Sequence, residues 1–150
     1  MPGGSVYWCV IDRVLVPMDG SEMSERALEY TLEAFPEAEV TVLHVVGEPS
    51  PMWGKAVGLA VADDLGERAE EVAEPVLDRA REIADEHERR QAVSTRVRLG
   101  HPVRSILDLA ADHDTVVVGG HGGSVSDKLY VGNVASRVVR RSPCPVIVVR

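Results

Sequence analysis

The chain is predicted to fold as an α/β domain with a doubly wound, five-stranded parallel sheet of order 3-2-1-4-5 and helices on both faces. Two observations predict this class. Short valine-rich runs alternate with longer segments in which apolar residues recur at helical spacing. Strands that alternate with helices form parallel sheets, and right-handed crossovers favour the doubly wound order. The 150 residues suit one domain. We expect an N-terminal extension over residues 1–11 and the domain over residues 12–150.

The first strand is predicted from a short apolar run, Val14–Val16, which is typical of a strand buried on both faces. A helix follows, because apolar residues then recur every three or four positions. Either Asp19 or Ser21 can supply the N-cap of this helix, and Pro36 ends it.

The middle of the chain repeats this alternation. A second strand is predicted over Val40–Val46, and a loop rich in proline and glycine follows it. Helical spacing then extends from Lys55 to about Arg90, with a kink or break expected near Pro75, because proline removes a backbone hydrogen bond. One apolar stripe of this helix is expected to face the core: Leu65, Ala69, Val72, Val76, Ala80, Ile83 and His87.

The last third predicts three more strands and two more helices. Ser94–Leu99 alternates like a strand, and residues 106–110 mark the next helix. A buried strand over Thr115–Val118, a helix from about Gly132 to Arg141 and a final strand over Val146–Val149 complete the order.

A glycine-rich segment joins the fourth predicted strand to the last helix. The strand leads directly into Gly119-Gly120-His121-Gly122-Gly123, and Gly132-Asn133 begins the helix. Glycines let the backbone approach a ligand closely, and a helix N-terminus carries partial positive charge. The pattern therefore indicates a phosphate site, or else glycines that only turn the chain between strand and helix.

The predicted topology places this segment at a binding crevice. Ligands of doubly wound sheets bind beyond the carboxyl ends of the strands where the order reverses, here between the first and fourth strands. The residues that leave those two strands are Pro17-Met18-Asp19 and Gly119–Gly123. Glycine chemistry and topology point to the same place.

Several segments together resemble the universal stress protein (UspA) family from about Asp12 to Arg150. The matching segments are Arg13-Val14-Leu15-Val16-Pro17-Met18-Asp19-Gly20-Ser21, Val42-Leu43-His44-Val45-Val46, Gly100-His101-Pro102, Gly119-x2-Gly122-x9-Gly132 and Ser142-Pro143-Cys144-Pro145-Val146-Ile147-Val148-Val149. ATP-binding members of this family carry a G-x2-G-x9-G motif followed by Ser or Thr. The resemblance implies a Rossmann-like fold and an ATP site.

The resemblance also implies roles for individual residues. Asp19 would bond the ribose or the adenine edge, and the Val45 backbone would face the adenine. The glycines would let main-chain N–H groups reach the phosphates, with Mg²⁺ or Mn²⁺ bridging phosphate oxygens and no side chain assigned as a metal ligand. His44 would be a core residue. The expected nucleotide-binding residues are Pro17, Met18, Asp19, Val45, Gly119, His121, Gly122, Gly123, Gly132, Asn133 and Val134.

Two residues depart from the family pattern. Asn133 stands where the family has a hydroxyl residue, although its amide can donate a hydrogen bond and can cap a helix. Gly123 stands where ATP-binding relatives often have Lys or Arg. Lys128 is either a substitute for that charge or a surface lysine.

We expect a regulatory stress-response protein that binds ATP with little or no hydrolysis, and therefore not an enzyme. The alternatives are a nucleotide-free dimer that acts through protein partners, and a slow ATPase in which His121 assists. No nucleophile or Walker-type motif supports the ATPase. A receiver-type signalling domain is excluded, because no Asp ends the third predicted strand and no Lys ends the fifth.

Composition and the chain's end predict its partners and location. The net charge of −8 argues against nucleic acid. No apolar run approaches the roughly 20 residues that span a bilayer, and no signal peptide is evident, so we expect a cytoplasmic protein. The last strand, Val146–Val149, is expected at the sheet edge, where the family resemblance implies a homodimer contact.

Overall fold

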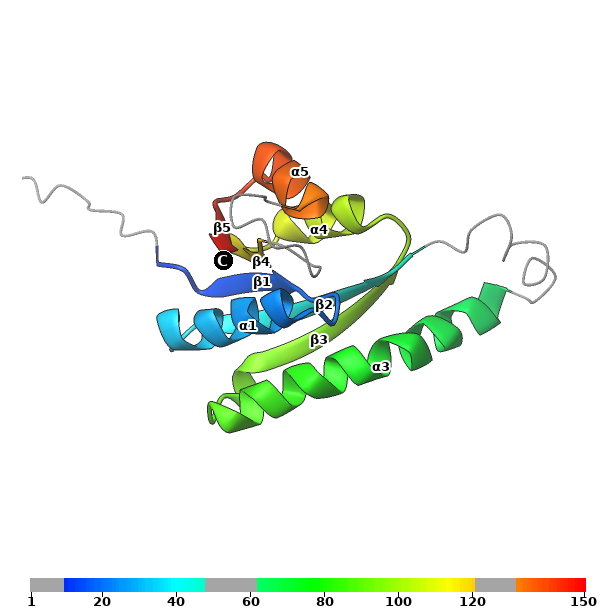
Figure 1. Cartoon of the computed structure of the whole chain (residues 1–150), viewed down its shortest axis with the longest axis horizontal. Helices are drawn as coiled ribbons and strands as arrows, with labels where there is room; N and C mark the ends of the chain where they lie inside the picture. Colours follow the sequence, from blue (N-terminus) through cyan, green and yellow to red (C-terminus); the bar gives the residue numbers. More distant parts are fainter. Residues whose placement is uncertain (1–9, 48–61, 121–131) are drawn as a thin grey trace, which may run out of the picture.

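The computed structural model describes residues 10–47, 62–120 and 132–150. Five strands in this part of the chain form one parallel sheet of order β3-β2-β1-β4-β5 (Figure 1). This confirms the predicted fold class and strand order. The strands are β1 (Arg13–Pro17), β2 (Glu39–Val46), β3 (Val93–Leu99), β4 (Thr115–Gly119) and β5 (Val146–Val149).

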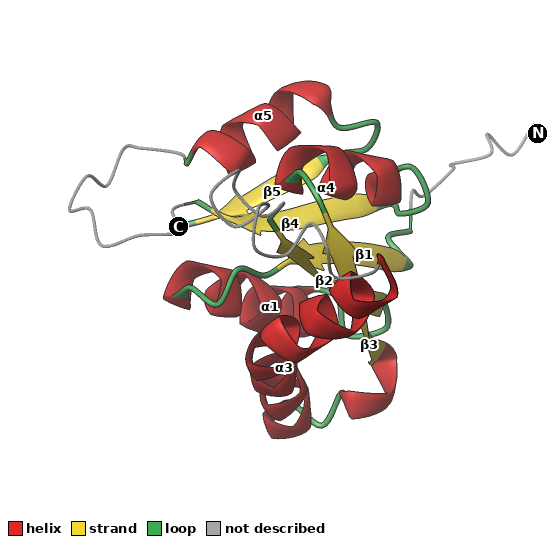
Figure 2. Ribbon diagram, turned by 90° about the vertical axis from the view of Figure 1, so that its right-hand side faces the viewer, coloured by secondary structure: helices red, strands yellow, loops and turns green. Residues whose placement is uncertain are grey.

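Helices cover both faces of the sheet. One pair lies on one face and the other pair on the opposite face (Figure 2). The first pair is α1 (Glu22–Ala34) and α3 (Ala62–Glu86), and the second is α4 (Pro102–Ala110) and α5 (Asn133–Arg141). A short 3-10 turn over Arg90–Ala92 precedes β3.

The alternation of side chains along the central strand explains the two layers. Val14 and Val16 of β1 are fully buried in a core shared with α1 and α3. Leu15, between them, is fully buried in a second core shared with α4 and α5. Successive residues of a strand point to opposite faces, so a strand covered on both sides consists entirely of apolar residues.

A kink or break was expected near Pro75; helix α3 continues through Pro75, so the helix does not break there. Pro75 is exposed, whereas Ala73 and Leu77 on either side are buried against the first core. Packing of an apolar face supplies most of the stability of a helix in a protein, and here it offsets one missing backbone hydrogen bond.

The buried stripe of α3 also differs from the prediction at several positions. Ala69, Ala80 and Ile83 are buried as expected, but Val72 is 61% exposed. A helix of 3.6 residues per turn brings position 73 rather than 72 over residue 69. The buried residues that the prediction missed are Ala73, Leu77 and Ala84.

The amino ends of β1 and β4 are joined by a carboxylate. Asp114 Oδ2 accepts hydrogen bonds from the backbone N–H groups of Arg13 (2.8 Å) and Asp12 (3.0 Å). These bonds, the one from Arg13 first, lower the pKa of Asp114. The opposite, carboxyl end of the same two strands opens into a cleft.

Candidate functional site

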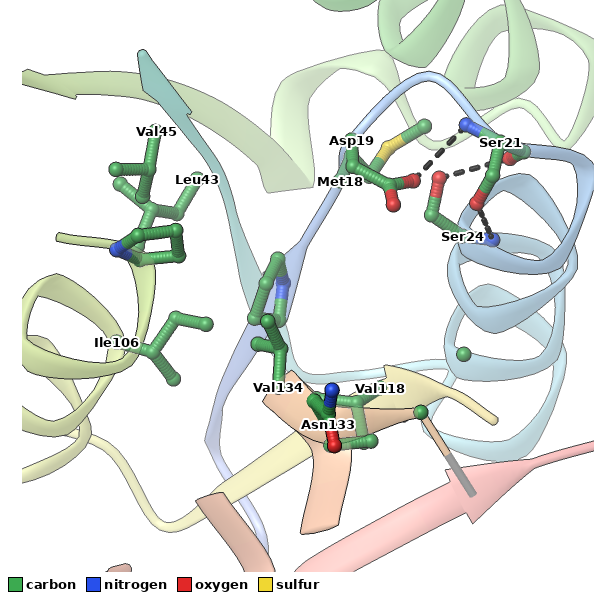
Figure 3. Close-up of a pocket in the computed structure, with 15 residues that line it drawn as sticks. Met18, Asp19, Ser21, Ser24, Leu43, Val45, Ile106, Val118, Asn133 and Val134 are labelled. Carbon is green, nitrogen blue, oxygen red and sulfur yellow. Dashed lines mark hydrogen bonds between the residues drawn. The ribbon is translucent and has the colours of Figure 1, made fainter. Parts of the chain in front are cut away.

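An open cleft of about 530 Å³ lies beyond the carboxyl ends of β1 and β4 (Figure 3). This is the point where the strand order reverses. Its lining comes from three strands and from the first turns of three helices. The lining residues are Pro17, Met18, Asp19, Ser21, Ser24, Leu43, Val45, Pro102, Ile106, Val118, Gly119, Gly132, Asn133, Val134 and Ala135.

Most of the residues predicted for the nucleotide site line this cleft. They are Pro17, Met18, Asp19, Val45, Gly119, Gly132, Asn133 and Val134. The other predicted residues, His121, Gly122 and Gly123, lie outside the described residues, as does Lys128.

The sequence analysis missed part of the apolar lining. Leu43 stands two residues before Val45 on the same strand face, and Val118 precedes Gly119, so strand periodicity could have found both. Pro102 and Ile106 come from α4, and no sequence signal places that helix over the cleft.

Apolar and polar groups occupy different sides of the cleft. Leu43, Val45 and Ile106 lie on one side, and Asp19 and Ser21 lie on the other (Figure 3). A flat apolar ring fits the first side, whereas hydroxyl groups of a ligand would find an acceptor at Asp19. Asp19 is the single charged side chain among the described residues that line the cleft.

The N-terminus of α1 satisfies its own hydrogen-bond donors. Ser21 is the N-cap, and its Oγ accepts a hydrogen bond from the Ser24 N–H (3.2 Å). Asp19 Oδ1 accepts one from the Ser21 N–H (2.9 Å), which shapes a turn in which Gly20 has a φ of +84°. Of the two predicted caps, Ser21 is therefore the cap, and Asp19 orders the turn before it.

The N-terminus of α5 is built differently. Its N-cap is Gly132, no side chain caps it, and its first turn has no acidic residue. Asn133 is the first helical residue, is exposed and does not act as the cap. The first-turn N–H groups of a helix have no partner within it, and here they belong to cleft-lining residues, Asn133, Val134 and Ala135.

Two backbone hydrogen bonds hold this helix start on the sheet. The Gly132 N–H donates to the Gly120 carbonyl (2.7 Å), and the Gly120 N–H donates to the Val149 carbonyl (2.7 Å). The Gly132 N–H is thus engaged within the chain. A phosphate at this helix would meet the N–H groups that follow it, and the bonded glycines fix their position.

Gly119 is required by packing, independently of any ligand. A Cβ atom at this position would lie 2.7 Å from the carbonyl carbon and oxygen of Met23 in α1. The missing side chain allows α1 to pack directly on the end of β4. The glycine-rich segment therefore serves helix packing at its first residue, a role that neither interpretation of the sequence pattern included.

His44 stands between the lining residues Leu43 and Val45 on β2 and does not itself line the cleft. Its Nδ1 is 2.7 Å from the Met18 carbonyl oxygen, so the ring ties β2 to the chain leaving β1. It is half-buried rather than a full core residue, which corrects the expectation for this position.

No cluster of three or more His, Cys, Asp or Glu side chains that could hold a metal ion occurs in the described part of the chain. The same part contains no helix of the length and hydropathy needed to cross a bilayer.

A family model described as "Universal stress protein family" matches residues 11–150. The chain belongs to the universal stress protein family. Universal stress protein YxiE of Bacillus subtilis is 29% identical over 150 residues, which cover 94% of this chain and 100% of the relative. The solved structure of universal stress protein UspA from Lactobacillus plantarum superimposes with a TM-score of 0.70 at 26% identity, covering 93% of this chain and 98% of that one.

Two further solved structures share the fold and are described with ligands. One is a universal stress protein in complex with cAMP, with a TM-score of 0.59 at 24% identity, covering 94% of this chain and 98% of that one. The other is a family member from Arabidopsis thaliana with AMP bound, with a TM-score of 0.53 at 19% identity, covering 92% of this chain and 90% of that one. Some proteins of this fold thus bind adenine nucleotides.

Proposed function

We propose that this universal stress protein binds ATP in the cleft between β1 and β4 and acts as a stress-response regulator with little or no hydrolysis. The observation that carries the proposal is the start of α5. Its uncapped first turn opens on the same cleft as an apolar wall and one carboxylate. The adenine nucleotides in two structures of this fold support the choice of ligand.

The three parts of an adenosine phosphate match three parts of the cleft. The base packs against Val45 and Ile106, and the ribose hydroxyls donate hydrogen bonds to Asp19. The phosphates lie at the N-terminus of α5, where backbone N–H groups and the helix dipole favour negative charge. A cleft of about 530 Å³ is within the usual size of small-molecule sites.

The lining has too few carboxylates to bind a metal ion through protein side chains alone. Asp19 is the one carboxylate among the described lining residues. Mg²⁺ prefers oxygen ligands and is commonly bound through substrate phosphates. A nucleotide-bound Mg²⁺ therefore fits this cleft and reduces repulsion between the phosphates and Asp19.

Regulation rather than catalysis is proposed because the described lining contains no group arranged for phosphoryl transfer. It has no lysine, arginine or histidine. Phosphoryl transfer depends on cations and on a residue that positions the attacking water. We therefore expect ATP affinity in the micromolar range or weaker, and hydrolysis near background.

Calorimetric titration with MgATP tests the proposal. Asn133→Ser is expected to tighten binding, because a hydroxyl restores a hydrogen bond to a charged oxygen, on the order of 1.5–3 kcal/mol before desolvation. If neither the wild type nor this variant binds adenine nucleotides at millimolar concentration, the alternative function is correct, namely a nucleotide-free dimer that acts through protein partners.

Asp19→Ala separates ligand binding from turn formation. A loss of ATP affinity with a small change in melting temperature supports the ribose contact. A loss of about 1 kcal/mol of stability with unchanged affinity would assign Asp19 to the turn before α1 alone.

We also propose that the protein forms a homodimer that pairs β5 with its symmetry mate, and that it acts on a protein partner. β5 is the last strand of the described sheet, and its residues Val146–Val149 are all half-buried. An uncovered apolar edge strand favours pairing with another chain. Light scattering at micromolar concentration is expected to show a dimer for the wild type and a monomer for Val148→Asp; a monomeric wild type would rule the contact out.

A further inference from the structure

Two arginines of β3 lie beside the apolar floor of the cleft. The parallel register places Arg96 next to Leu43 and Arg98 next to Val45. Both of these β2 neighbours line the cleft. Neither arginine belongs to the motifs of the sequence analysis or to the described lining of the cleft.

The register also decides the face on which they lie. Val93 and Val97 of β3 pack on the core beneath α1 and α3. Side chains alternate along a strand, so Arg96 and Arg98 project to the other face, where Leu43 and Val45 belong to the core of α4 and α5.

Helices α4 and α5 leave this part of the sheet open. Ser94, Arg96 and Arg98 are exposed, as is Leu99 at the end of the strand, whereas Val93, Thr95 and Val97 are half-buried. Neither arginine makes an ion pair or side-chain hydrogen bond with another described residue. Their guanidinium groups are free of the contacts that hold Arg79, Arg81 and Arg89 in place.

We propose that Arg98 contacts the nucleobase and closes the end of the cleft opposite α5. Neighbouring strands are about 4.8 Å apart, and an extended arginine spans more than this distance. Its planar guanidinium can stack on the face of a purine over Val45, or donate to the ring nitrogens. The contact rests on the proposed nucleotide function and adds a residue that determines base affinity.

The position of each arginine in the sheet predicts how much its replacement should weaken nucleotide binding. Arg98 lies beside Val45, near the carboxyl end of β2, whereas Arg96 lies beside Leu43, one pleat deeper. Arg13 pairs with Glu39 at the amino end of the sheet, away from the cleft. Arg98→Ala should therefore have the largest effect, Arg96→Ala a smaller one, and Arg13→Ala none.

The experiment is a calorimetric titration of AMP, ADP and ATP into the wild type and these variants. Arg98→Ala is expected to weaken all three nucleotides by the same factor, about tenfold, because the base is common to them. Arg98→Lys keeps the charge but loses the planar fork, so it should restore less than half of the lost binding free energy. A thermal melt of each variant checks that the fold is intact.

Three results separate the possible outcomes. A loss that grows from AMP to ATP and disappears at high salt would mean long-range attraction of phosphates, and would overturn the base contact. Unchanged affinity in Arg98→Ala would also overturn the base contact. The remaining role of the arginines would then be to prevent the edge strand β3 from pairing with another chain. Failure of the wild type to bind any of the three nucleotides would overturn the proposed function itself.

Discussion

Helices α1 and α5 begin at the same cleft, and their first turns differ. At α1, Ser21 caps the helix and the first turn contains Glu22 and Glu25. At α5, a glycine occupies the N-cap position, no side chain caps the helix, and no acidic residue follows. The start of α1 is capped by its own side chain, whereas the first-turn N–H groups of α5 have no side-chain acceptor and can bind a ligand.

A helix start can accept an anion when its first turn has neither a capping side chain nor an acidic residue. The dipole and the first-turn donors are present in every helix. A serine cap uses one of these donors, and two glutamates add negative charge that repels a phosphate. Helix α5 presents the first-turn N–H groups of three consecutive lining residues, whereas α4, which is also uncapped, begins at the cleft with Pro102, which has no N–H.

The largest expected effect is at Gly119, where α1 meets β4. Gly119→Ala should lower the free energy of unfolding by about 3 kcal/mol, because its Cβ would lie 2.7 Å from the Met23 backbone. Gly120→Ala is the matched control, since its Cβ would be 3.1 Å from the Val149 oxygen and should cost less. Urea denaturation measures both; equal losses would contradict the packing role of Gly119.

The other end of α1 depends on an arginine from beyond α3. The Arg89 guanidinium donates to the carbonyl oxygens of Leu32 (2.9 Å), Phe35 (3.2 Å) and Ala38 (2.8 Å). Arg89→Ala leaves these acceptors without that donor and should cost about 2 kcal/mol. Arg90→Ala removes one exposed ion pair with Asp85 and is expected to change stability little. The two variants differ by one position, so urea midpoints compare them directly.

Ser21→Ala tests the capped helix start. The variant should lose about 1 kcal/mol of stability, because the Ser24 N–H loses its acceptor. Ser21→Asp keeps an acceptor and should restore most of that loss. Nucleotide affinity should change little in either variant, and a large loss of ATP binding in both would show that α1 also contacts the phosphates.

Gly132→Asp tests the uncapped helix start and has the smallest expected effect on stability. The new carboxylate caps α5, which should stabilise the protein by a few tenths of a kcal/mol relative to glycine. The same group uses a first-turn donor and repels phosphate, so ATP affinity should fall by about tenfold or more. Gly132→Asn provides the neutral control. Unchanged ATP affinity in Gly132→Asp would show that the phosphates do not bind at the N-terminus of α5.

The sequence predicted the elements well where periodicity was unambiguous. Strands such as Val146–Val149 and the α5 helix to Arg141 occur at the expected residues. The errors concern α3, where Pro75 is accommodated and Val72 is exposed. Both errors have one cause, because the packing of α3 against the sheet decides which neighbouring positions are buried.

For the candidate site, local sequence signals gave the residues that leave β1 and β4. They did not distinguish the two helix starts, because Ser21, Asp19 and Asn133 all have side chains able to cap a helix. They also did not indicate that the Cβ of an alanine at position 119 would clash with Met23, since that contact joins residues far apart in the chain.

By itself, the sequence determined the fold class, the strand order, the family and the end of the sheet at which the cleft lies. The fold class, the strand order and the position of the cleft follow from short-range patterns of apolar residues and glycines, together with the handedness of connections. The family follows from the resemblance of several short motifs to those of known members. Only the tertiary structure decided that Ser21 caps α1 while α5 is left uncapped, why Gly119 must lack a side chain, and that Arg98 stands beside Val45. Each of these depends on strand register or on the approach of one backbone to another, and such distances are set by packing between segments rather than by the residues within one.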